Sequence, residues 1–212
     1  MSTDRSFPSF QSRIIPVVAL DDAQHAVPLA HALLAGGIDV IEVTLRTPAG
    51  LPAISMLRDQ VPNIVVAAGS ILNVADLEAA CTAGAMAVFS PGATTELLSA
   101  GRSMKVPFVP GIATPSELML AMTFGYPLVK LFPAEALGGV RMLSALAGPL
   151  PSVRFCPTGG IHRENLKDYL RLPQVAFVGG TWIASSALIR QENWKEISRL
   201  SQEATDLAAL AG

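Results

Sequence analysis

Cysteine, histidine and lysine are all scarce in this chain of 212 residues, which holds two, three and four of them. Cys81 and Cys156 form no CxxC pair and no disulfide framework, so we expect two small buried side chains in a cytoplasmic protein. His25 and His31 are six residues apart and cannot share one helical face. With so few histidines a metal centre is hard to build, and we expect neither a metal nor a cofactor.

Long apolar runs and basic clusters are absent as well. No stretch of about twenty residues escapes interruption by a charge, Pro or Gly, so we expect no membrane partner. Residues 1–10 carry Asp4, Arg5 and Pro8 in place of an apolar core, so we expect no signal peptide. The formal net charge is -2 and the sequence has no run of Lys and Arg, which argues against nucleic-acid binding.

The chain is instead rich in short apolar runs. Half of the residues are hydrophobic and 15% are charged, which is typical of a globular chain with a large core. Buried parallel strands read as such runs, bounded by Gly, Pro or polar residues. We predict strands at 14–19, 40–45, 64–68, 86–89, 106–109, 128–132, 154–157 and 175–178. Amphipathic spacing predicts helices at 22–35, 114–123, 139–146, 163–170 and 194–210.

Eight strands with helices between them, in about two hundred residues, favour an α/β fold of the (β/α)8 TIM-barrel type. The rival, a doubly wound open sheet, usually has a GxGxxG fingerprint after its first strand. Residues 20–22 (LDD) follow the first predicted strand here and contain no glycine. We therefore expect a single barrel domain at 13–212, preceded by a segment at 1–12.

Two predicted strands carry a charged side chain toward the barrel interior. Because side chains alternate in a strand, Glu42 and Arg46 share the inward face of 40–46. Lys130 is the one lysine in the middle of a predicted strand and faces inward in the same way. A desolvated lysine beside a carboxylate suits imine chemistry on a carbonyl group. A structural buried ion pair is the alternative, although such pairs stabilise folds poorly.

Glycine pairs end the last two predicted strands. Gly159 and Gly160 follow Thr158, and Gly179 and Gly180 precede Thr181. Loops after strands seven and eight often form the phosphate site of a barrel, through backbone N–H groups and a helix N-terminus. These loops could therefore hold a phosphate on an acidic protein. Other strand ends are less specific: Ser70 could offer a hydroxyl and Pro91 a wall, and both fit ordinary turns.

Four motifs, in order along the chain, carry a resemblance. They are 42–46 (EVTLR), 90–92 (SPG), 130–135 (KLFPAE) and 154–160 (RFCPTGG). Together they resemble 2-keto-3-deoxy-6-phosphogluconate aldolase, the family that also cleaves 4-hydroxy-2-oxoglutarate. The similarity runs from about residue 13 to the last predicted helix.

The resemblance implies a metal-independent, trimeric (β/α)8 aldolase that forms an imine with pyruvate, its product. It implies that Lys130 forms the imine, that Glu42 is the general acid and base, and that Arg46 engages the substrate carboxylate. It places Ser70 near that carboxylate, where many members have threonine, and Pro91 and Phe132 along the pyruvate pocket. The residues that match the phosphate-binding ends are Thr158, Gly159, Gly160, Gly179, Gly180 and Thr181.

Other functions remain open at this point. The substrate could be the galactonate epimer or unphosphorylated 4-hydroxy-2-oxoglutarate. An isomerase or epimerase could use Glu42 as its base without any imine, and a sugar-phosphate sensor would turn nothing over. Members of the family often have serine where this chain has Thr181.

Overall fold

Parallel strands alternate with helices throughout the computed structural model, which describes residues 7–211. Each strand is short and almost wholly buried because it packs against neighbours on both faces. The strands are β1 (Ile14–Val18), β2 (Val40–Thr44), β3 (Val65–Gly69), β4 (Ala87–Phe89), β5 (Phe108–Val109), β6 (Gly111–Ile112), β7 (Leu128–Leu131), β8 (Arg154–Pro157) and β9 (Val178–Gly180). Each run predicted as a strand therefore contains strand residues, although some bounds differ.

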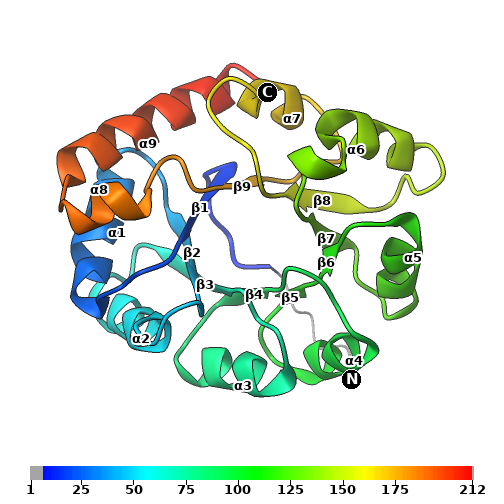
Figure 1. The fold of residues 1–212 in the computed structure, drawn as a ribbon, viewed down its shortest axis with the longest axis horizontal. Coiled ribbons are helices and arrows are strands. Elements are labelled where there is room, and N and C mark those ends of the chain that lie inside the picture. Colours follow the sequence, from blue (N-terminus) through cyan, green and yellow to red (C-terminus); the bar gives the residue numbers. More distant parts are fainter. Residues whose placement is uncertain (1–6, 212) are drawn as a thin grey trace.

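The strands form a curled parallel sheet with helices outside it (Figure 1). Six strands lie in the order β5-β4-β3-β2-β1-β9, and three more lie in the order β6-β7-β8. β5 pairs with β4 and β6 pairs with β7, so the chain passes from one sheet to the other at Pro110. Isolated bridges join Phe155 to Val175 and Thr158 to Gly179 on the other side. This arrangement is a single α/β domain.

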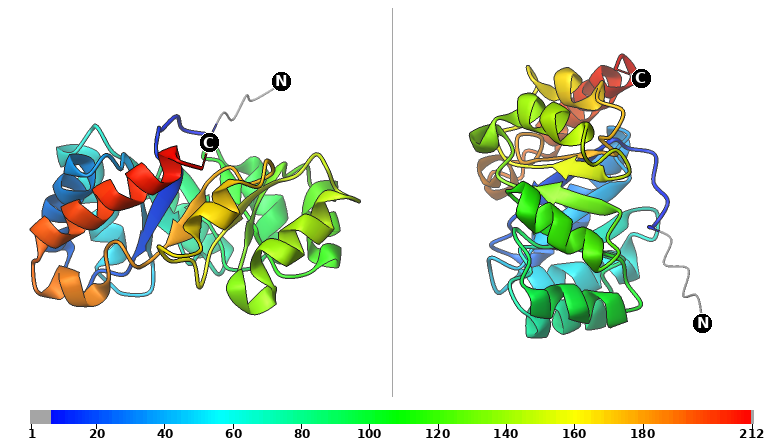
Figure 2. Two further views of the ribbon diagram at one scale, coloured as in Figure 1. Left: turned by 90° about the horizontal axis from the view of Figure 1, so that it is seen from above. Right: turned by 90° about the vertical axis from the view of Figure 1, so that its right-hand side faces the viewer.

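Helices follow most strands and cover their outer faces (Figures 1 and 2). Thr114 shows why one of them begins where it does: its side chain accepts from the N–H of Glu117, whose carboxylate accepts from the N–H of Thr114, and Pro115 opens the helix. The helices are η1 (Ala23–His25), α1 (Ala26–Ala35), α2 (Gly50–Gln60), α3 (Val74–Thr82), α4 (Thr95–Ser103), α5 (Pro115–Thr123), η2 (Glu135–Leu137), α6 (Gly139–Ala147), α7 (Leu166–Leu170), α8 (Ser186–Arg190) and α9 (Trp194–Ala209). No helix within residues 7–211 is long and apolar enough to cross a membrane.

Aromatic side chains close the amino-terminal end of the sheet. The ring of Phe7 stacks on that of Phe177 at 5.4 Å and meets the edge of Phe89 at 6.2 Å. Phe10 adds a further contact with Phe177 at 5.5 Å. Residues 7–12 of the expected N-terminal segment thus pack under the strands, while residues 1–6 lie outside the described part of the chain. The opposite, carboxyl ends of the strands are left for a site.

Several predicted boundaries were wrong, most of them by one residue and those of three elements by two or more. The last strand is Val178–Gly180 and not 175–178, because Val178 pairs with Ile14 of β1 whereas Val175 makes only an isolated bridge. The fifth strand begins at Phe108, and it continues beyond Pro110 as β6. The helix expected at 163–170 begins only at Leu166. Each boundary depends on pairing or packing with distant residues, which local apolar spacing does not report.

Candidate active site

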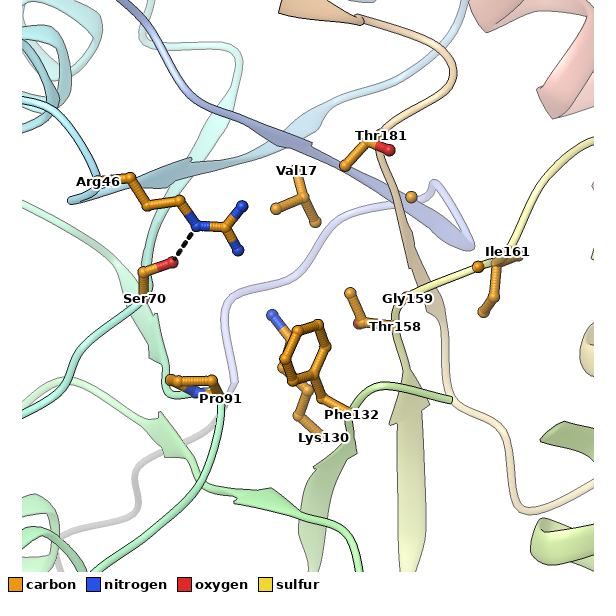
Figure 3. A pocket seen from close by; sticks show the side chains of 12 residues that line it. Val17, Arg46, Ser70, Pro91, Lys130, Phe132, Thr158, Gly159, Ile161 and Thr181 are labelled. Atoms are coloured by element: carbon orange, nitrogen blue, oxygen red, sulfur yellow. Dashed lines mark hydrogen bonds between the residues drawn. The ribbon is translucent and has the colours of Figure 1, made fainter. Parts of the chain in front are cut away.

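A cavity opens at the carboxyl ends of the strands, where the loops that follow them meet. It encloses about 590 Å³ of space, part of which is open to solvent. Its lining residues are Val17, Arg46, Ser70, Pro91, Lys130, Phe132, Thr158, Gly159, Gly160, Ile161, Gly180 and Thr181 (Figure 3). Ten of the twelve candidate residues from the sequence lie here, which is the edge that α/β folds use for ligands.

Lys130 and Glu42 form an ion pair beneath this cavity. The Lys130 Nζ lies 2.8 Å from Oε1 and 3.1 Å from Oε2 of Glu42, although the two residues are 88 positions apart in the chain. Glu42 is 1% exposed and Lys130 is 5% exposed. The amine also lies 5.4 Å from the centroid of the Phe89 ring. The amine therefore has an acidic partner, an apolar support below it and an open cavity above it.

Two backbone features make room for this pair. Lys130 and Glu42 come from β7 and β2, where period-two alternation turns both side chains inward. Gly69 at the end of β3 lies against the Glu42 carboxylate, since a Cβ there would be 2.1 Å from Oε1. A glycine is thus required beside Glu42, and the sequence gives no sign of this requirement.

Arg46 and Ser70 form the cationic wall of the cavity. The Nε of Arg46 donates to the Oγ of Ser70 at 2.9 Å, and the guanidinium projects over the cavity (Figure 3). Ser70 has a φ of 61°, a left-handed backbone conformation that residues other than Gly, Asn and Asp rarely adopt. Within residues 7–211 no carboxylate pairs with Arg46, so its charge is available to an anion.

The opposite wall is built from backbone. Gly159, Gly160, Gly180 and Thr181 line it together with Thr158. Gly179 lies behind this wall, because a Cβ on it would be 2.4 Å from the Thr158 Oγ1. The two glycines at 179–180 therefore have different roles. Gly179 leaves room for the side chain of Thr158, and Gly180 borders the cavity.

A helix N-terminus does not lie directly behind this wall, contrary to our expectation. The helix after Gly160 begins six residues later, at Leu166, and the helix after Thr181 begins at Ser186. The intervening residues are loop, so any anion held here would meet loop N–H groups.

Apolar side chains complete the cavity. Pro91 and Phe132 line it as expected, and the peptide bond between Phe132 and Pro133 is cis. Val17 and Ile161 also line it, and neither was a candidate from the sequence. Val17 lies on the inward face of β1, so strand alternation alone could have identified it. Ile161 follows the glycine pair in a loop and carried no recognisable signal.

Cys156 lies beside the lysine in the sheet, paired with Lys130 in register. Complete burial raises the pKa of its thiol to about 12; the charge of Lys130 opposes this rise only in part. Cys156 is accordingly an inert neighbour and not a nucleophile. His162 lies outside the cavity, exposed and paired with Glu164 at 2.8 Å. Among residues 7–211, His, Cys, Asp and Glu nowhere gather in a group of three that could hold a metal ion.

Fold and cavity together define a class. This is a parallel α/β enzyme whose site presents a desolvated lysine to a cavity, with an adjacent carboxylate, a cationic wall on one side and a backbone wall on the other. The model of the KDPG and KHG aldolase family matches residues 9–200 of the sequence, and the chain belongs to that family.

Known relatives cover nearly the whole chain. A 2-dehydro-3-deoxy-phosphogluconate aldolase from Pseudoalteromonas atlantica is 45% identical over 94% of this chain and 93% of its own. A KHG/KDPG aldolase from Escherichia coli is 45% identical over 93% and 92%. The crystal structure of KDPG aldolase from Legionella pneumophila, with pyruvate captured as a covalent carbinolamine intermediate, is 44% identical, covers 92% of this chain and 94% of its own, and has a TM-score of 0.90.

Proposed function

We propose that the protein is a class I, metal-independent aldolase that reversibly cleaves 2-keto-3-deoxy-6-phosphogluconate to pyruvate and glyceraldehyde 3-phosphate. It also cleaves 4-hydroxy-2-oxoglutarate to pyruvate and glyoxylate. The observation that carries this proposal is the amine of Lys130, buried under the cavity and 2.8 Å from the Glu42 carboxylate. The Legionella relative, which holds pyruvate as a covalent carbinolamine, supports the same chemistry.

Lys130 begins the reaction. Its neutral amine attacks the C2 keto group of the substrate to give a carbinolamine, and loss of water gives an iminium ion. Glu42, 2.8 Å from the amine, can accept the proton that the ammonium loses and return it to the departing hydroxyl. The positive iminium nitrogen then withdraws electrons from the bond between C3 and C4.

Glu42 serves the later proton transfers. Acting through a water molecule, it removes the proton from the C4 hydroxyl, and the electrons of the C3–C4 bond move into the iminium to give an enamine. Glyceraldehyde 3-phosphate departs as the aldehyde. The enamine is protonated at C3, and water hydrolyses the resulting imine to release pyruvate and the free amine of Lys130.

The two walls bind the two ends of the substrate. Arg46, held by Ser70, pairs with the carboxylate next to C2, and Pro91 and Phe132 enclose the pyruvate half. The phosphate lies on the backbone wall at the other end. The residues that hold it are Thr158, Gly159, Gly160, Gly180 and Thr181, with Gly179 behind Thr158. A positive wall and a wall of N–H groups suit a ligand with an anion at each end.

The proposal extends to the architecture and the assembly. We infer that the strands close into a (β/α)8 barrel at 13–212, with 1–12 as a leading segment. In support, only Pro110 separates β5 from β6. One isolated bridge joins Phe155 of β8 to Val175, and another joins Thr158 to Gly179 of β9. We further propose that the protein forms a homotrimer in the cytoplasm. The free cysteines Cys81 and Cys156 support that compartment, since disulfides are rare there.

Reductive trapping tests the function. The protein is incubated with pyruvate and borohydride, and its intact mass and peptide map are recorded. We expect a stable adduct on Lys130 and none in the Lys130→Met variant, which should fold but not turn over. Folded protein that yields no adduct, or a Lys130→Met variant that retains turnover, would instead favour an isomerase or a sensor. Cleavage rates on the gluconate and galactonate epimers and on 4-hydroxy-2-oxoglutarate then rank the substrates.

A further inference from the structure

The backbone wall at 158–161 is held by hydrogen bonds on its outer side. The N–H of Ala134 donates to the carbonyl of Thr158 at 2.8 Å, and the N–H of Glu135 donates to that of Gly159 at 3.0 Å. The carbonyl of Gly160 accepts from the side-chain Nδ2 of Asn165 at 3.1 Å. The carbonyls of Thr158, Gly159 and Gly160 are therefore occupied by groups that do not line the cavity.

The direction of these carbonyls decides where the N–H groups point. In a planar trans peptide, the carbonyl of one residue and the N–H of the next point in opposite directions. The N–H groups of Gly160 and Ile161 thus point away from Glu135 and Asn165. Neither N–H has an acceptor among residues 7–211, and both residues line the cavity. Two consecutive free N–H groups on one concave loop form an anion-binding nest.

The loop keeps this shape for two reasons. Gly159 and Gly160 have φ values of 99° and 79°, which glycine adopts without strain. Glu135 packs directly beneath, since a Cβ on Gly160 would lie 2.6 Å from the Cβ of Glu135. The hydroxyl of the buried Tyr169 donates to the Glu135 carboxylate and holds that side chain in place. The carbonyl of Gly159 is thus held by the main-chain N–H of Glu135, whereas the carbonyl of Gly160 is held by the side chain of Asn165.

Asn165 is the side chain that spans the loop. Its Oδ1 accepts from the N–H of His162 at 2.8 Å while its Nδ2 donates to the Gly160 carbonyl. If the amide oxygen and nitrogen were exchanged, the amide NH2 would face the N–H of His162 and the amide oxygen would face the carbonyl of Gly160. A donor would then oppose a donor and an acceptor an acceptor, so only the present orientation satisfies both partners. Asn165 does not line the cavity, and any effect it has on a ligand must pass through the loop.

We propose that Asn165 is a positioning residue for the phosphate end of the substrate: by holding the Gly160 carbonyl, it aims the N–H of Ile161 into the cavity. This inference rests on the proposed function, and it makes Asn165 matter for phosphorylated ligands alone. 4-Hydroxy-2-oxoglutarate has no phosphate, and its second carboxylate is bonded directly to C4, so we expect it not to reach the loop. Asn165 therefore contributes to discrimination between the two substrates without touching either of them.

The test compares Asn165→Ala with Asn193→Ala. Asn193 caps α9, where its side chain accepts from the N–H of Glu196, so Asn193→Ala removes a hydrogen bond between an Asn side chain and the main chain far from the loop. For Asn165→Ala we expect the KM for 2-keto-3-deoxy-6-phosphogluconate to rise about tenfold, the loss of one hydrogen bond to a charged group. The KM and kcat for 4-hydroxy-2-oxoglutarate should not change, and Asn193→Ala should leave both substrates unaffected.

Direct binding of inorganic phosphate, measured by calorimetry on the same three proteins, separates this inference from the aldolase assignment. A weaker affinity in Asn165→Ala alone supports the nest even if neither substrate is cleaved. Equal changes in KM for both substrates, unchanged phosphate affinity in Asn165→Ala, or no phosphate binding by the parent protein would each overturn the proposal.

Discussion

The carboxylate of Glu42 lies where the side chain of residue 69 would begin: a Cβ on Gly69 would be 2.1 Å from its Oε1 and 2.7 Å from its Cδ. Glu42 cannot move aside freely, because both of its oxygens are within 3.1 Å of the Lys130 amine. The ion pair therefore depends on a residue with no functional group, located on a third strand.

Replacing Gly69 with Ala should displace the carboxylate. We expect turnover to fall by about a hundredfold or more, since proton transfer by a positioned group contributes this much. The free energy of unfolding should fall by about 1–3 kcal/mol, as is usual when a methyl group is forced into a packed interior. Steady-state kinetics and denaturant titration measure the two effects. Gly148→Ala is the matched control, because a Cβ there meets nothing within 4 Å. Equal turnover and equal stability of the two variants would contradict the dependence of the ion pair on Gly69.

Replacing Glu42 with Gln keeps the shape and removes the charge. We expect single-turnover cleavage to slow by about 10²- to 10⁴-fold, since an amide cannot accept the proton from the C4 hydroxyl. Binding of inorganic phosphate involves only the opposite wall and should be unchanged in calorimetry. If the rate and the phosphate affinity fall together, Glu42 is structural and the proposed mechanism loses its base.

Arg46→Lys tests the carboxylate-binding wall. A lysine keeps the positive charge but cannot both donate to the Ser70 Oγ and present a planar fork to a carboxylate. We expect the Kd for pyruvate to rise about tenfold, with a smaller rise for Ser70→Ala, which removes only the anchor. A double-mutant cycle should show coupling of about 1 kcal/mol between the two positions. Strict additivity would mean that the hydrogen bond between them does not contribute to binding.

Cys156 should resist thiol reagents in the folded protein. Its pKa of about 12 lies above that of an exposed thiol because the side chain is buried, so the protonated form persists as the pH rises through 9. Burial also raises the pKa of Cys81, but that side chain is only half-buried. Folded Cys81→Ala protein should therefore label very slowly at pH 9 and rapidly after unfolding. Rapid labelling of the folded variant would show that the lysine environment opens.

Much of the site was predictable because its information is local. Period-two alternation in a strand depends only on neighbouring residues, so the inward faces of Glu42 and Lys130 follow from the order of polar and apolar residues around them. The glycine pairs likewise indicate where backbone can approach an anion. The four motifs, from EVTLR to RFCPTGG, were sufficient to predict the family.

Other features depend on which segments become neighbours when the sheet curls. Residues 42 and 130 meet across the sheet, and no spacing within either strand determines their 2.8 Å contact. Pairing with β1 set the true bounds of the last strand. Packing placed Gly179 against Thr158 and Gly180 at the edge of the cavity. Sequence alone thus determined the chemical groups and the faces on which they lie. Only the tertiary structure decided their partners, including the space at Gly69 and the bond from Asn165, because a contact depends on the path of the whole chain between its two ends.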